Sequence, residues 1–169
     1  MLKHSLLAIA IATAALAQNQ APASATGEMK AAYNGIKNNL TKMAEKVPDD
    51  SYAFKATPEV RTFGALMQHI ADSQLRTCSA VLGDAKQPKA GPETKEAVVA
   101  ALKDSFAVCD KAFEALTDAN SMEAITTPRG SRTRLGALYG IIVHGNEEYG
   151  YGSIYLRLKG ITPPSSDRR

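Results

Sequence analysis

Apolar residues recur every three to four positions along four stretches of this chain, which is the period of an amphipathic helix. The stretches are residues 27–46, 62–82, 93–116 and 133–159, so the pattern predicts an all-α fold of four helices. The predicted core positions of the first three are Met29, Ala32, Tyr33, Ile36, Leu40 and Met43; Phe63, Leu66, Met67, Ile70, Cys78 and Val81; and Val98, Leu102, Phe106, Cys109, Phe113 and Leu116.

Residues that favour helix ends flank these stretches. Pro48 stops the first, Thr62 and Thr133 stand at N-cap positions, and Gly83 and Gly160 stand at C-terminal stops, with Pro163-Pro164 beyond the last. The segments between them, 52–60, 86–92 and 118–132, read as connections, of which the third is long and rich in Thr, Ser, Pro and Gly. The residues after 164 read as a short tail, 165–169.

The last predicted helix contains an unusual number of glycines: Gly136, Gly140, Gly145, Gly150 and Gly152. Each interior glycine costs about 0.5–1 kcal/mol relative to alanine. Either close packing against a neighbouring helix or space for a ligand would offset this cost, and the sequence favours neither.

The start of the chain has the features of a secretory signal. Lys3 and His4 precede an apolar run, residues 6–16, and Ala15-Leu16-Ala17 fits the small-x-small cleavage pattern. Cleavage after residue 17 would leave 152 residues, enough for one domain with a real core. We therefore predict a signal peptide over 1–17, a disordered lead-in over 18–25, a bundle over 26–164 and a periplasmic or secreted protein. An uncleaved anchor is the alternative.

Charge and cysteine content narrow the picture further. The net charge of +3 falls to +2 without Lys3, and no basic block stands out, so we expect no nucleic-acid partner. Cys78 and Cys109 form no CxxC or CxxCH motif, which disfavours a redox dithiol and covalent haem. In an exported protein they are either a disulfide or two buried thiols.

Without the leader, the chain has two histidines, His69 and His144. Glu148 follows His144 by one helical turn, so the two side chains share a helix face. Two imidazoles and a carboxylate can hold a divalent metal with open coordination positions. The alternatives are a surface i,i+4 contact and a core histidine. Glu147 points about 100° off the ligand face, away from Glu148, and is the weaker carboxylate candidate.

Two segments resemble the DinB-like (DinB/YfiT-like) family of helical-bundle metalloproteins, and the similarity extends over nearly all of the chain after the leader. The first runs from Thr57-Pro58-Glu59-Val60-Arg61-Thr62-Phe63 to Gln68-His69-Ile70-Ala71-Asp72. The second, more specific, comprises His144-Gly145-Asn146-Glu147-Glu148-Tyr149-Gly150 and Ile154-Tyr155-Leu156-Arg157-Leu158-Lys159-Gly160-Ile161-Thr162-Pro163-Pro164.

The resemblance implies a four-helix bundle of up-down-down-up arrangement and a divalent ion, commonly nickel or zinc, bound by His69 and His144. The third ligand position falls on Glu148, where the family usually has histidine; a carboxylate there favours harder metals, or marks a member that has lost tight binding. Parallel second and third helices would place Cys78 and Cys109 at the same height, which implies a disulfide.

The resemblance also suggests roles around the metal. Asp72 could orient His69 through its free ring nitrogen, or be an exposed aspartate. Tyr151 and Tyr155 could line the pocket, or pack in the core. The implied function is a metal-dependent hydrolase or thiol-group transferase acting on a small molecule, with a homodimer as a family expectation. The alternative is a non-catalytic envelope binding or stress protein with a vestigial site; a haem or copper carrier is disfavoured. The sequence leaves substrate, metal identity and oligomeric state open.

Overall fold

Each predicted helix begins at a hydroxyl side chain that caps it. The computed structural model describes residues 24–127 and 130–167, and its four long helices are α1 (Ala25–Lys46), α2 (Phe63–Val81), α3 (Lys95–Glu114) and α4 (Arg134–Leu158). The hydroxyls of Ser24, Thr62, Thr94 and Thr133 each accept a hydrogen bond from the backbone N–H three residues on. Gly83 and Gly160, with φ of 78° and 71°, end α2 and α4 as predicted.

Some boundaries differ from the sequence prediction. Helix α1 starts at Ala25 rather than 27, and α3 starts after Thr94 rather than at 93. A 3-10 turn, η1 (Asp49–Ser51), follows Pro48, and a second, η2 (Pro164–Ser166), lies in the region predicted as tail. The predicted signal peptide and most of the predicted lead-in fall outside the described residues. Among those described, no helix is both long and apolar enough to cross a bilayer.

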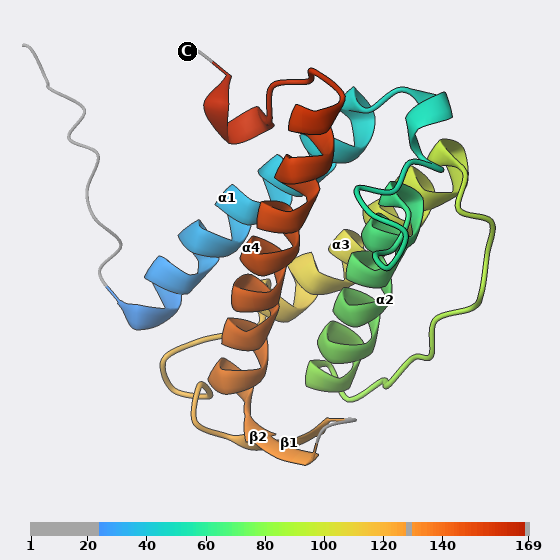
Figure 1. Cartoon of the computed structure of the whole chain (residues 1–169). Helices are drawn as coiled ribbons and strands as arrows, with labels where there is room; N and C mark the ends of the chain where they lie inside the picture. Colours follow the sequence, from blue (N-terminus) through green and yellow to red (C-terminus); the bar gives the residue numbers. More distant parts are fainter. Residues whose placement is uncertain (1–23, 128–129, 168–169) are drawn as a thin grey trace, which may run out of the picture.

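The helices run up, down, down and up (Figure 1), which confirms the predicted four-helix arrangement. Parallel contacts fix the α2–α3 pair: Thr62 Oγ1 donates to Glu93 Oε2 at 2.7 Å, and Ser105 Oγ donates to Gln74 Oε1 at 3.0 Å. Further down the same pair, Cys78 and Cys109 form a disulfide with their Cα atoms 4.9 Å apart. The predicted disulfide is therefore confirmed.

The predicted core positions are buried in the bundle, with the exception of the helix-α1 residues Met29 and Ala32. Aromatic side chains from separate helices meet there: the Tyr33 ring stacks on Phe113 at 3.9 Å between centroids, and the Tyr33 hydroxyl donates to Asp110 Oδ1 at 2.7 Å. One apolar core therefore joins all four helices and fixes where α2 and α4 face each other.

The long connection predicted over 118–132 contains two short strands that the sequence pattern did not predict. A two-stranded antiparallel hairpin, β1 (Ala124–Thr127) and β2 (Gly130–Thr133), pairs Ala124 with Thr133 and lies across the lower ends of α2 and α4 in Figure 1. Backbone bonds from Arg134 N to Glu123 O and from Leu135 N to Ser121 O tie the segment to the start of α4. Four-residue strands are too short to show a clear alternation of apolar and polar residues.

Close packing of α4 against α1 explains two of its glycines. A Cβ on Gly145 would lie 3.1 Å from Ile36 Cγ1, and one on Gly152 would lie 2.5 Å from Met43 Sδ. At these two positions the missing side chain lets the helices approach, and the dispersion attraction between the closely packed helices offsets the cost of glycine. Gly150 has open space where a Cβ would stand, so packing does not explain it.

A glycine in α2 provides a sharp stability test. A Cβ on Gly64 would stand 2.5 Å from the backbone oxygen of Glu93, which cannot move without displacing the start of α3. We expect Gly64→Ala to lower the free energy of unfolding by about 1–3 kcal/mol. Gly35→Ala is the matched control: nothing lies within 4 Å of its Cβ, so helix propensity should raise stability by about 0.5–1 kcal/mol. Urea denaturation of both variants checks the pair, and equal effects would contradict the close α2–α3 approach.

Candidate metal centre

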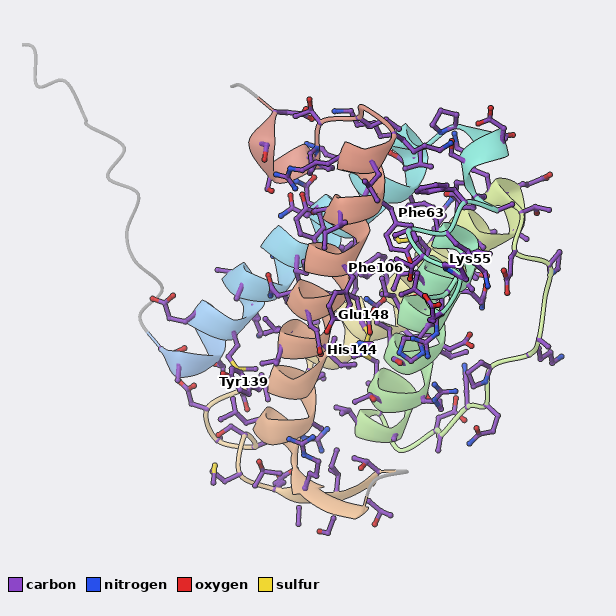
Figure 2. All side chains as sticks on the ribbon, viewed as in Figure 1. Lys55, Phe63, Phe106, Tyr139, His144 and Glu148 are labelled. Atoms are coloured by element: carbon purple, nitrogen blue, oxygen red, sulfur yellow. A yellow bond between two sulfur atoms is a disulfide. The ribbon has the colours of Figure 1, made fainter. Side chains whose placement is uncertain are left out.

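The two histidines of the described chain and Glu148 meet between α2 and α4. His69 lies near the middle of α2, and His144 and Glu148 lie one turn apart on α4, on the side that faces α2 in Figure 2. The two Nε2 atoms stand 3.2 Å apart, and Glu148 Oε1 lies 3.3 Å from His144 Nε2 and 3.6 Å from His69 Nε2. The predicted ligand set therefore converges on one point from two elements far apart in sequence.

These three separations match a shared cation. A point about 2.0 Å from all three atoms exists close to their plane, and Zn²⁺ lies about 2.0–2.2 Å from His nitrogen and carboxylate oxygen. A three-ligand site of this kind leaves further coordination positions open. The donor set of two imidazoles and one carboxylate suits divalent first-row metals.

The carboxylate is the most buried member of the cluster. The Glu148 side chain is 8% exposed, against 20% for His144 and 29% for His69. This burial raises the pKa of Glu148, the positive charge of Arg61 opposes the rise, and the charge of Glu147 adds to it. Glu148 Oε2 is buried and accepts no hydrogen bond within the described part of the chain. A buried carboxylate oxygen without a hydrogen-bond partner is rare, and a bound cation would supply the missing interaction.

The neighbouring carboxylates behave differently. Glu147 is exposed and accepts a hydrogen bond from the Tyr151 hydroxyl at 3.1 Å, so the preference for Glu148 over Glu147 agrees with the geometry. Asp72 lies one turn from His69 and is half-buried, and its Oδ1 accepts from Gln68 Nε2 at 2.8 Å. Its proposed role in orienting His69 stays a prediction.

The two tyrosines line an apolar pocket that borders Glu148. The pocket has a volume of about 570 Å³ and also includes Val60, Arg61, Leu66 and Ile154. Tyr155 is buried, and its hydroxyl donates to the backbone oxygen of Arg61 at 2.7 Å, whereas Tyr151 is 51% exposed and is not a core residue. Both tyrosines border this pocket, and Tyr155 also belongs to the hydrophobic core.

A second, smaller pocket lies on the opposite side of the cluster. It has a volume of about 70 Å³ and borders His144, with Arg76 from α2 and Arg132 from β2 among its lining residues. The sequence pattern did not single out Arg61 or Arg132 as site residues. Their positions depend on a connection and a hairpin whose course the helical period does not predict.

Comparisons with known proteins agree with this fold. The family model for the DinB superfamily matches residues 33–151. A search of curated proteins finds no match. The fold is similar to a DinB-like protein from Bacillus cereus ATCC 10987 (17% identity, TM-score 0.67, 80% of this chain and 93% of the other). It is also similar to the DinB-like protein YjoA from Bacillus subtilis (18%, TM-score 0.64, 80% and 94%).

A third solved structure is more distant. It is a histidine-to-alanine mutant of the mycothiol-dependent maleylpyruvate isomerase, with 13% identity, a TM-score of 0.58, and coverage of 75% of this chain and 59% of the isomerase. At these identities the structures show the fold alone. The family match spans more than half of the chain. The chain therefore belongs to the DinB superfamily.

Proposed function

We propose that this protein is a metal-dependent enzyme that acts on a small molecule by hydrolysis or by transfer of a thiol group. The observation that carries the proposal is the convergence of His69, His144 and Glu148, whose ligand atoms lie within 4.8 Å of one another beside a pocket. A structural site would be closed by a fourth protein ligand, and within the described residues this cluster has three.

A divalent ion bound in this position would lower the pKa of a water or thiol bound to it. The chain's own contribution is to hold the three ligands and to shape the space next to them. Leu66, Tyr151 and Ile154 give the larger pocket an apolar wall that would receive the body of a substrate and displace water. The fold similarity to a mycothiol-dependent isomerase supports a thiol as one of the two candidate reactants.

The test is metal-dependent turnover by the untagged protein. Nitrophenyl ester hydrolysis and the coupling of small thiols to an aromatic electrophile would be measured in the metal-loaded protein, in the chelated protein and in His144→Ala. The proposal expects one activity that disappears in the last two samples. Bound metal with no such activity would instead favour the alternative function, a non-catalytic envelope binding protein with a vestigial site.

We also propose that the protein is exported. The Cys78–Cys109 disulfide supports this because disulfides persist in oxidising compartments and are rare in the cytosol. Expression of the full chain in a bacterium should give a periplasmic product whose intact mass corresponds to a start at Gln18, with the two thiols resistant to alkylation. A cytoplasmic product that retains residues 1–17 would contradict the proposal.

A further inference from the structure

The small pocket beside His144 is enclosed by three elements. Helix α2 contributes Ser73, Arg76 and Thr77, helix α4 contributes Ala137, Gly140, Ile141 and His144, and the hairpin contributes Thr127 and Arg132. Figure 1 shows the hairpin at the lower ends of α2 and α4. The pocket therefore adjoins the proposed chemistry through the ligand His144.

The charge of this pocket is uncompensated. Two arginines line it, and none of its described lining residues is a carboxylate. Within the described part of the chain, the guanidinium groups of Arg76 and Arg132 make no ion pair and no hydrogen bond, and Arg76 accepts one from Ser79 Oγ only through its backbone oxygen. By contrast, Arg134 binds Glu123 Oε2 at 3.1 Å and the Val81 backbone oxygen at 2.8 Å. Two like charges in a narrow concave space raise the local concentration of anions.

A glycine of α4 makes room for one of these guanidiniums. A Cβ on Gly140 would lie 3.3 Å from Arg132 Nη1, whereas a Cβ on Gly136 would first meet the capping hydroxyl of Thr133 at 2.9 Å. The planar group thus lies against Gly140, where a larger residue would crowd it. This placement accounts for one of the glycines that helix packing does not explain.

The lining offers hydroxyls as well as charge. Ser73, which is buried, and Thr77 line the pocket together with the two arginines. Guanidinium and hydroxyl donors around a small cavity are the groups that bind carboxylate, phosphate and sulfonate oxygens. A volume of about 70 Å³ suits one such group rather than a whole substrate.

We propose that this pocket binds the anionic group of the substrate and holds it next to the metal centre. The substrate class is then a small acid whose acidic group lies between Arg76 and Arg132. Its reacting atom would lie beside His144, and any apolar portion would extend toward Leu66 and Tyr151. That the anion is a substrate rests on the proposed function. Anion binding itself requires only the arginines.

The experiment titrates metal-free and nickel-loaded full-length protein with inorganic phosphate, sulfate and acetate, using calorimetry and the Nε–H signals of arginine in NMR spectra. Arg76→Gln and Arg132→Gln should each weaken anion binding at least about tenfold, because each removes a charge-assisted hydrogen bond. Lys111→Gln removes the same charge from an exposed site on α3 and should change the dissociation constant less than about twofold.

The outcomes separate the two proposals. Tighter phosphate or sulfate indicates a phosphorylated or sulfonated acid, and tighter acetate indicates a carboxylic acid. Two results would overturn the pocket assignment. The first is anion binding that survives both arginine substitutions. The second is anion binding that occurs only in the nickel-loaded protein and is lost in His144→Ala. Nickel titrations of the same variants test the metal site separately. If anions bind but nickel does not, the metal site is wrong; if nickel binds but anions do not, the anion site is wrong.

Discussion

Replacing His144 by alanine is expected to weaken divalent-metal binding about 100- to 1,000-fold. Structural zinc sites with four ligands contribute about 10–16 kcal/mol, so one ligand accounts for roughly 3–4 kcal/mol. Two further features add to the loss in this protein. The partner ligand Glu148 is buried, and the substitution leaves His69 and Glu148, whose Nε2 and Oε1 atoms are 3.6 Å apart, as the two remaining ligands.

The measurement is competition against a chromophoric chelator with zinc and nickel, using protein without a histidine tag. Glu147→Gln is the matched control, since it removes an exposed carboxylate from the adjacent position of the same helix. Glu148→His keeps a ligand atom at the third position and should retain binding, whereas Glu148→Ala should behave like His144→Ala. Unchanged affinity in His144→Ala would place the metal elsewhere.

Removing the disulfide is expected to lower the free energy of unfolding by about 3–4 kcal/mol. Cys78 and Cys109 are 31 residues apart, and closing a loop of that length restricts the unfolded chain by about this amount. The bond also joins α2, which supplies His69, to the rest of the core. Such a loss corresponds to a fall in melting temperature of about 10 °C for a domain of this size.

Cys78→Ala/Cys109→Ala avoids placing hydroxyls at two positions that are 0% exposed. Thermal unfolding followed by circular dichroism compares this variant with the wild type under oxidising and reducing conditions. The reductant should lower the melting temperature of the wild type and leave that of the variant unchanged. Equal melting temperatures for the variant and the oxidised wild type would contradict a stabilising role for the disulfide.

The fold could be predicted largely because apolar side chains recur at the helical period on the buried face of each helix. The 3.6-residue period marked each helix, and Thr62, Thr133, Gly83 and Gly160 marked ends that the structure confirms. The order of the helices in space did not follow from that period. It came from the resemblance, and with it came the side-by-side placement of Cys78 and Cys109.

The site was predictable in its ligands and not in its surroundings. His144 and Glu148 share a helix face by spacing alone, but the distance to His69 depends on how α2 packs against α4. Arg61 and Arg132 enter from a connection and a short hairpin, where no periodic pattern indicates the direction of a side chain. Tertiary packing, rather than local propensity, places them.

The most direct test of the metal centre is anomalous diffraction from crystals of the untagged protein grown with zinc or nickel, with data collected on both sides of the metal absorption edge. Our account predicts one strong peak about 2.0–2.2 Å from Nε2 of His69, Nε2 of His144 and a carboxylate oxygen of Glu148. A crystal that binds metal at other residues, or an empty cluster at saturating metal, would contradict it.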